Sequence, residues 1–167
     1  MPEEQIRRRV VNVPNPGKFE VIIGQANFSI KTVDDIFMSV IMSSPGVKCG
    51  VAMNEHQPKL TRVNFNDRQL GELAADLCKE IGAGHVFVVY VKGAFTMHVL
   101  PYVRNLPTVA TVFASSSNIP MQVIVADTDI GSAVMGVVDG MSVTRVEDEK
   151  EKQERREQVE KFGYKLP

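Results

Sequence analysis

The chain has 167 residues, of which 44% are hydrophobic and 23% are charged, and its formal net charge is -1. This composition is typical of a folded globular protein, and the length suits one domain with its own core. The near-neutral charge balance lacks the basic excess typical of nucleic-acid binders. No apolar segment approaches the roughly 20 residues that span a bilayer, and the first nine residues lack the apolar core of a signal peptide. We therefore expect one cytoplasmic domain over 1–167, without a nucleic-acid or membrane partner.

The N-terminal segment, 1–18, predicts a polar lead, because Pro14, Pro16 and Gly17 interrupt regular structure. Its three consecutive arginines, 7–9, favour a solvated arm over a ligand site, because the run is short and isolated.

Alternating strand and helix patterns follow the lead. Short apolar runs between turn residues predict seven strands, over 19–23, 47–53, 59–65, 86–91, 109–113, 121–126 and 133–138. Helical spacing predicts one helix capped by Thr32, a second capped by Asn66 with Gln69 completing a capping box, and a third over 96–106 that Pro101 keeps short or kinked. This order predicts an α/β fold, a three-layer α/β/α sandwich with a mixed sheet and an inserted β-hairpin that turns at 54–58.

The last segment, 147–167, predicts a charged C-terminal helix and tail. Opposite charges recur at i, i+4 spacing, which supports a solvated helix. Phe162 and Tyr164 are the rings expected to attach its end to the domain.

The stretch 82–91 is the centre of the predicted fold. A non-alternating apolar run after a glycine turn is typical of a central strand buried on both faces, and Gly82 suits the left-handed end of the preceding helix. His85 opens this strand, where it is either held by backbone hydrogen bonds or acts as a general base or phosphate acceptor. Gly82 and Gly84 would let a phosphate approach the backbone.

Four carboxylates are further candidates. Glu55 lies at the hairpin tip, where it is a solvated turn residue or a partner for a ligand or a histidine. Asp139 ends a buried strand, where it either lines a ligand crevice or makes an Asp-Gly turn. Asp127 and Asp129 either bind magnesium or solvate a turn. The two cysteines lack CxxC spacing and predict reduced thiols, so we assign no metal site.

Five segments, in order and with similar spacing from Phe19 to Leu166, resemble the adenosine-specific kinase family: Phe28–Asp35, Gly50–Ala52 with Glu55, Ile81–His85, Gly136–Gly140 and Gly163–Leu166. The resemblance implies a compact three-layer α/β fold, a homotrimer, and binding of adenosine or its nucleotides. It also implies a phosphotransferase that uses ATP, with Mg²⁺ on the nucleotide and His85 as phosphate acceptor or base. Glu55, Gly82, Gly84 and Asp139 are then the expected nucleotide-binding residues.

The sequence departs from the family pattern at three places. His56 and Gln57 stand where the family has Ala-Ser, and Thr108 stands where a glutamate is usual. Ser132, within 131–133, replaces the arginine of a Gly-Arg-Gly motif, and serine cannot supply that bidentate positive charge. The alternative function is therefore a non-catalytic nucleotide-binding or structural oligomeric protein that has lost kinase activity. The phosphate acceptor, the physiological substrate and the pathway stay open at this stage.

Overall fold

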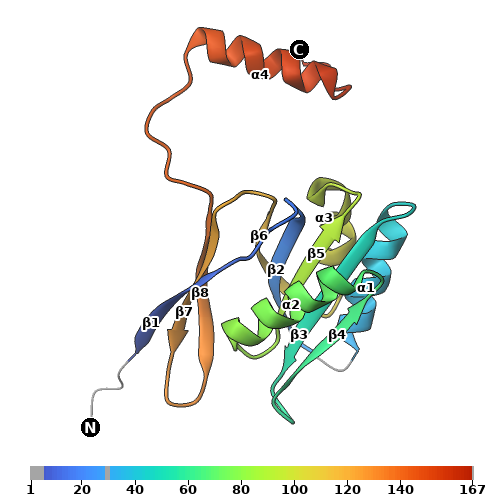
Figure 1. Ribbon diagram of the computed structural model, residues 1–167, viewed down its shortest axis with the longest axis vertical. Helices are drawn as coiled ribbons and strands as arrows, with labels where there is room; N and C mark the ends of the chain where they lie inside the picture. The colour runs from blue at the N-terminus through green and yellow to red at the C-terminus, as the bar shows by residue number, and fades with distance from the viewer. Residues whose placement is uncertain (1–5, 29–30, 167) are drawn as a thin grey trace.

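The computed structural model describes residues 6–28 and 31–166 (Figure 1). The first five residues of the predicted lead, and Ser29 and Ile30 of the family-like stretch, lie outside the described residues. Within the described ranges, no helix is both long and apolar enough to cross a bilayer.

The larger of two sheets has five strands in the order β4 (Leu60–Phe65), β3 (Lys48–Glu55), β5 (Val86–Lys92), β2 (Glu20–Ala26) and β6 (Val109–Ser116). All four of its pairings are antiparallel, where the sequence analysis expected a mixed sheet. The predicted β3–β4 hairpin is present, and β3 is buried within the sheet.

Helices α1 (Thr32–Ser43), α2 (Arg68–Ile81) and α3 (Thr96–Arg104) explain the absence of parallel pairs in this sheet. Each helix connects two strands that run in the same direction but have one opposite strand between them. The helical crossovers therefore place like-directed strands two positions apart, and the α/β class is confirmed with an antiparallel sheet.

The smaller sheet has the order β1 (Arg7–Asn12), β7 (Met121–Asp127) and β8 (Ser132–Asp139). Strand β1 lies inside the predicted polar lead and pairs with β7 along its whole length. Val11 of β1 is buried, whereas Arg7 and Arg8 are exposed and Arg9 is half-buried. The sequence of β1 therefore does not resemble that of a buried strand.

The core has two parts, one on each face of the large sheet. Helices α1 and α3 cover one face, whereas α2 and the small sheet together cover the other, which gives three layers. Strand β5 sends alternate side chains into both parts, so the prediction of a central strand buried on both faces is confirmed.

Two predicted helix caps are wrong by one residue. Thr32 is the first residue of α1, and Lys31 occupies the cap position. Asn66 instead joins α2 to the sheet by accepting a 2.7 Å hydrogen bond from the Cys49 amide, and Asp67 caps α2.

The C-terminal arm, residues 140–166, leaves β8 and carries α4 (Glu149–Lys161) away from the body (Figure 1). A capping box of Asp148 and Glu151 begins α4, and none of its residues is buried. Phe162 and Tyr164 line an apolar crevice with Phe95, the residue that precedes α3, so the arm contacts the body near its far end.

Candidate functional site

Three turns bound a cavity of about 620 Å³ at one end of the large sheet. Glu55 is the last residue of β3 before the β3–β4 turn, Gly82 and Gly84 belong to the α2–β5 turn, and Ser132 is the first residue of β8 after the β7–β8 turn. The structure therefore brings together three of the residues that the sequence analysis proposed for nucleotide binding, and it adds Ser132 from the small sheet.

Asn54, which the sequence analysis missed, fixes the glycine turn in place. Its buried side-chain amide donates to the carbonyl oxygens of Cys78 (2.8 Å) and Ala83 (2.9 Å), and its side-chain oxygen accepts from the Thr61 hydroxyl (2.8 Å). Its backbone oxygen also accepts from the amide of His85 at 3.1 Å. One residue of β3 thus holds the end of α2, the glycine turn and the start of β5.

His85 is half-buried and adopts a left-handed backbone conformation, with φ of 59°. Its amide donates to Asn54 of β3, and its carbonyl oxygen accepts from the amide of Ala26 of β2 at 2.9 Å. Left-handed backbone is uncommon outside glycine, and such residues concentrate at functional sites. Among the described residues that line the cavity, His85 is absent, whereas its neighbour Gly84 is present.

Glu55 lies at the cavity as half of a buried ion pair. Its side chain is 5% exposed, and its Oε2 lies 2.6 Å from Nε of Arg62 on β4. The N–H does not point at the oxygen, so neither atom has a hydrogen-bond partner among the described residues. The carboxylate has a second oxygen with which to accept a hydrogen bond from a ligand.

Arg9 connects the small sheet to the end of α2, which corrects the prediction of a solvated arm. Its guanidinium donates to the carbonyl oxygens of Glu80 (2.7 Å) and Ile81 (2.8 Å) and pairs with Asp127 at 2.9 Å. Ser132 donates to the same carboxylate at 2.6 Å. The hydrogen bond from Arg9, and then that from Ser132, lowers the pKa of Asp127 below its ordinary value.

The C-terminal end of α2 faces the cavity, and a helix C-terminus carries partial negative charge that disfavours anions. Positive charge at the cavity comes from Lys59 and Lys79, two exposed lysines that the sequence analysis did not single out. His56 and Asp76 also line the cavity. No local signal marks these lysines in the sequence, because each comes from a different element and only the fold brings them together.

Asp139 lies away from this cavity, at the far end of β8 from Ser132. Its carboxylate accepts a 3.0 Å hydrogen bond from the side chain of Asn118. In the part of the chain that the structure describes, no cluster of three or more His, Cys, Asp or Glu side chains is arranged to hold a metal ion.

Both cysteines are free and fully buried. Burial raises the pKa of the Cys49 thiol, and likewise that of Cys78, to about 12. Cys78 donates to the carbonyl oxygen of Val86 at 3.3 Å, directly behind the glycine turn. These thiols therefore pack as neutral groups.

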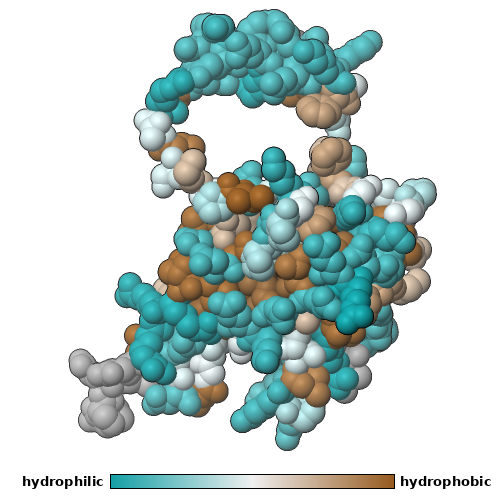
Figure 2. Space-filling view, viewed as in Figure 1, coloured by the Kyte–Doolittle hydropathy of each residue, from teal (hydrophilic) through white to brown (hydrophobic). Residues whose placement is uncertain are grey.

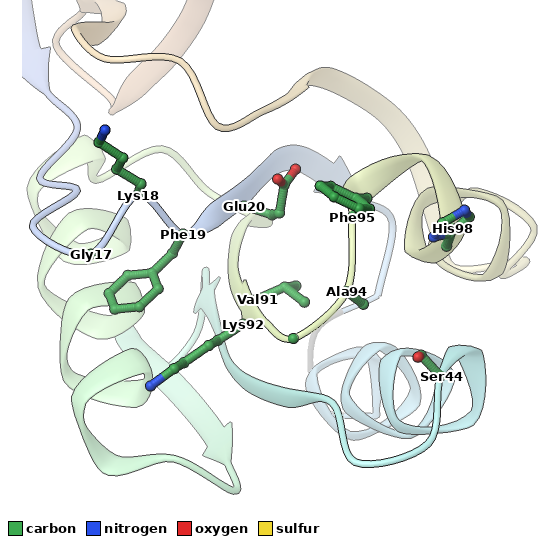
Figure 3. A pocket seen from close by; sticks show the side chains of 11 residues that line it. Gly17, Lys18, Phe19, Glu20, Ser44, Val91, Lys92, Ala94, Phe95 and His98 are labelled. Atoms are coloured by element: carbon green, nitrogen blue, oxygen red, sulfur yellow. The ribbon is translucent and has the colours of Figure 1, made fainter. Parts of the chain in front are cut away.

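A second cavity, of about 480 Å³, lies at the opposite end of the large sheet (Figure 3). Glu20 lines it and accepts a 3.1 Å hydrogen bond from the amide of Thr96 at the start of α3. Figure 3 shows Lys18 and Lys92 extending away from each other, so their charges do not converge on one point. The cavity at the glycine turn, where both lysines and the buried carboxylate line one volume, is the better candidate site.

Comparison of the chain with known proteins shows the family to which this fold belongs. The model of the family described as "Adenosine specific kinase" matches residues 11–165. The chain belongs to this family, as the resemblance in its sequence indicated.

A solved structure extends the comparison to three dimensions. The chain is similar to the PH1918 protein from Pyrococcus horikoshii OT3, known from a crystal structure, with 49% sequence identity and a TM-score of 0.94. The match covers 98% of this chain and 100% of that one. No curated protein matches the chain.

Proposed function

We propose that the cavity at the glycine turn binds adenosine or an adenine nucleotide, and that the protein transfers a phosphoryl group with His85 as phosphate acceptor or base. Membership of the adenosine-specific kinase family supports the class of ligand. The observation that carries the proposal is the meeting of Glu55, Gly84 and two lysines in one cavity, next to a histidine in left-handed backbone.

Each part of a nucleotide has a suitable partner here. Glu55 lines the cavity and would accept from a ribose hydroxyl or an adenine amino group through the carboxylate oxygen that is not paired with Arg62. Lys59 and Lys79 would hold phosphate by charge. The Gly82 amide already donates to Cys78 at the end of α2, so Gly84 is the glycine whose amide would meet the phosphate.

His85 would act through one ring nitrogen. As acceptor, the neutral imidazole attacks the terminal phosphorus of the nucleotide, the bond to the bridging oxygen breaks, and the nucleoside diphosphate leaves with that oxygen. As base, the same nitrogen takes the proton of the hydroxyl group that attacks phosphorus. An imidazole nitrogen can serve either as a nucleophile or as a base.

Magnesium fits this site as an ion that arrives with the nucleotide. Mg²⁺ is usually held by one or two protein carboxylates together with substrate phosphates, and it neutralises the transferring group. Asp76 lines the cavity, whereas Asp127 is engaged by Arg9 and Glu55 by Arg62. Asp76 is therefore the carboxylate that would meet the ion.

Replacing His85 with asparagine tests the catalytic role. We expect His85→Asn to keep adenosine affinity within about tenfold, or about 1.4 kcal/mol. Residue 85 does not line the cavity, and asparagine is polar like histidine. Incorporation of label from terminally labelled ATP should fall to background. His98→Asn, at the opposite end of the sheet, should match the parent in both assays. Label incorporation by His85→Asn at the parental rate would disprove the role.

The second candidate function is nucleotide binding without catalysis, and one observation favours it. The side chains of Ser132 and Arg9 both bind the Asp127 carboxylate. Neither side chain is therefore free to bind a phosphate beside the cavity. In that case adenosine should raise the unfolding temperature of both parent and His85→Asn, because a ligand of the native state stabilises it, while neither incorporates label.

We also propose, from the family resemblance, that the protein assembles as a homotrimer with the cavity near a subunit boundary. Light scattering should then give three times the chain mass. A monomer at all concentrations would exclude this arrangement.

A further inference from the structure

Arg62 compensates the buried charge of Glu55, although Arg62 does not itself line the cavity at the glycine turn. Its Nε lies 2.6 Å from Oε2 of Glu55, and among residues 6–28 and 31–166 Glu55 forms no other ion pair. Within the described part of the chain, Glu55 belongs to the lining of the cavity and Arg62 does not. Any effect of Arg62 on a ligand in this cavity therefore acts through Glu55.

The burial of this ion pair is not well explained by stability alone. The Glu55 side chain is 5% exposed, and that of Arg62 is 37% exposed. Removing two charges from water is costly, so replacing a buried ion pair with apolar side chains is often neutral or stabilising. Removing one partner alone is different, because the other charge is left buried and uncompensated. The pair is better explained by what Glu55 does at the cavity.

The position of Arg62 decides which carboxylate oxygen of Glu55 a ligand can reach. In the β3–β4 register Met53 is opposite Arg62 and Glu55 is opposite Leu60, so Arg62 is the diagonal neighbour of Glu55 on the edge strand. Oε2 of Glu55, beside this guanidinium, is buried. At the lower edge of the body, the β3–β4 hairpin and the β7–β8 turn project with an opening between them (Figure 2). A ligand that enters there meets Oε1.

We propose that Arg62 is a positioning residue for nucleoside binding: it holds Oε2 of Glu55, so that Oε1 selects ligands that donate a hydrogen bond. A carboxylate accepts hydrogen bonds and does not donate them, so the ligand must supply the proton. In adenosine the donor is either the amino group of the base or a hydroxyl group of the ribose, and the experiment distinguishes these two sources. The inference rests on the proposed binding of adenosine in this cavity.

Calorimetric titration of four nucleosides into the full-length parent and Arg62→Met tests this role. Because methionine removes the charge and keeps an apolar stem, adenosine should bind about tenfold more weakly or worse, a loss of about 1.4 kcal/mol. Inosine lacks the amino group, and 2′-deoxyadenosine and 3′-deoxyadenosine each lack one hydroxyl group. The loss caused by Arg62→Met should disappear for the analogue without the donor to Oε1, which a merely structural role would not produce. Arg62→Lys, which keeps the charge, should restore most of the affinity.

A double variant keeps the test valid if Arg62→Met alone does not fold. In Glu55→Gln no buried carboxylate needs a cation, so adding Arg62→Met should leave adenosine affinity at the value of Glu55→Gln alone. Arg68→Met, which removes an exposed ion pair with Glu72 on α2, should bind all four nucleosides as the parent does.

Three results would overturn the positioning role while the parent still binds adenosine. They are parental affinity in Arg62→Met, an equal loss for all four nucleosides, and a further loss in the double variant. A parent that binds none of the four would instead overturn the proposed function, and the role of Arg62 with it.

Discussion

At the scale of single residues, Asn54 is the side chain on which the geometry of the site depends most. It is 7% exposed and donates second hydrogen bonds to the Cys78 and Ala83 carbonyl oxygens, which each also accept from one backbone amide. Because a hydrogen bond contributes about 0.5–1.5 kcal/mol, Asn54→Ala should lower the free energy of unfolding by about 1–3 kcal/mol.

Urea denaturation measures this loss, and Asn64→Ala is the matched control. Asn64 donates an exposed hydrogen bond to Asp34, so its removal should change stability by less than about 0.5 kcal/mol. Equal effects of the two substitutions would show that Asn54 does not organise the turn.

Asp127 makes the site sensitive to acid. Its pKa is lowered in the folded protein, so its contribution is complete above the unfolded value of about 3.9 and is lost as the pH falls through the lower folded value. The difference in unfolding temperature between the parent and Asp127→Asn should therefore be constant above about pH 5 and shrink below about pH 4. Other titrating acids are common to both proteins and cancel in this difference. A difference that grows in acid would contradict the ion pair with Arg9.

At the scale of elements, α2 packs on β3 at a point where only glycine fits. A Cβ built on Gly50 would lie 2.2 Å from the backbone carbon of Leu70 and 2.3 Å from the amide nitrogen of Gly71. Neither atom can move without the helix, so Gly50→Ala should destabilise the protein by about 1–3 kcal/mol or more.

Because α2 ends at the cavity, we expect Gly50→Ala to weaken adenosine binding as well. Gly136→Ala on β8 is the control, because an added Cβ there meets nothing within 4 Å, and its effect should stay within about 0.5 kcal/mol. Chemical denaturation and calorimetry of both variants check the two effects. Wild-type stability in Gly50→Ala would mean that α2 is free to shift.

Elements with strong apolar patterns could be predicted from the sequence, whereas pairings could not. The central strand β5 was predictable because both of its faces are apolar. Strand β1 was not, because its partner β7 lies more than 100 residues later and its outward arginines hide the alternation. The same separation hides the link from Arg9 to Asp127, which no local pattern contains.

At the scale of the whole molecule, the site is a product of topology. Glu55, Gly82 and Gly84 could be proposed from their local patterns, and they share one cavity because three turns meet at one end of the sheet. The sequence alone could not identify Lys59, Lys79 and Asn54 as site residues. An exposed lysine or an asparagine in a strand has no distinctive local pattern, and only the fold shows which residues surround it. Asp139 ends a strand as predicted, but that strand points away from the cavity.

The most direct measurement titrates adenosine and adenosine monophosphate into two lysine variants by calorimetry. Lys79 lines the cavity at the glycine turn, and Lys92 lines the cavity at the opposite end of the sheet. Because methionine keeps the apolar stem and removes the charge, Lys79→Met should weaken monophosphate binding about tenfold or more, or about 1.4 kcal/mol, and leave adenosine binding unchanged. Lys92→Met should bind both ligands as the parent does. Weakened monophosphate binding in Lys92→Met, with parental binding in Lys79→Met, would contradict the assignment of the nucleotide to this cavity.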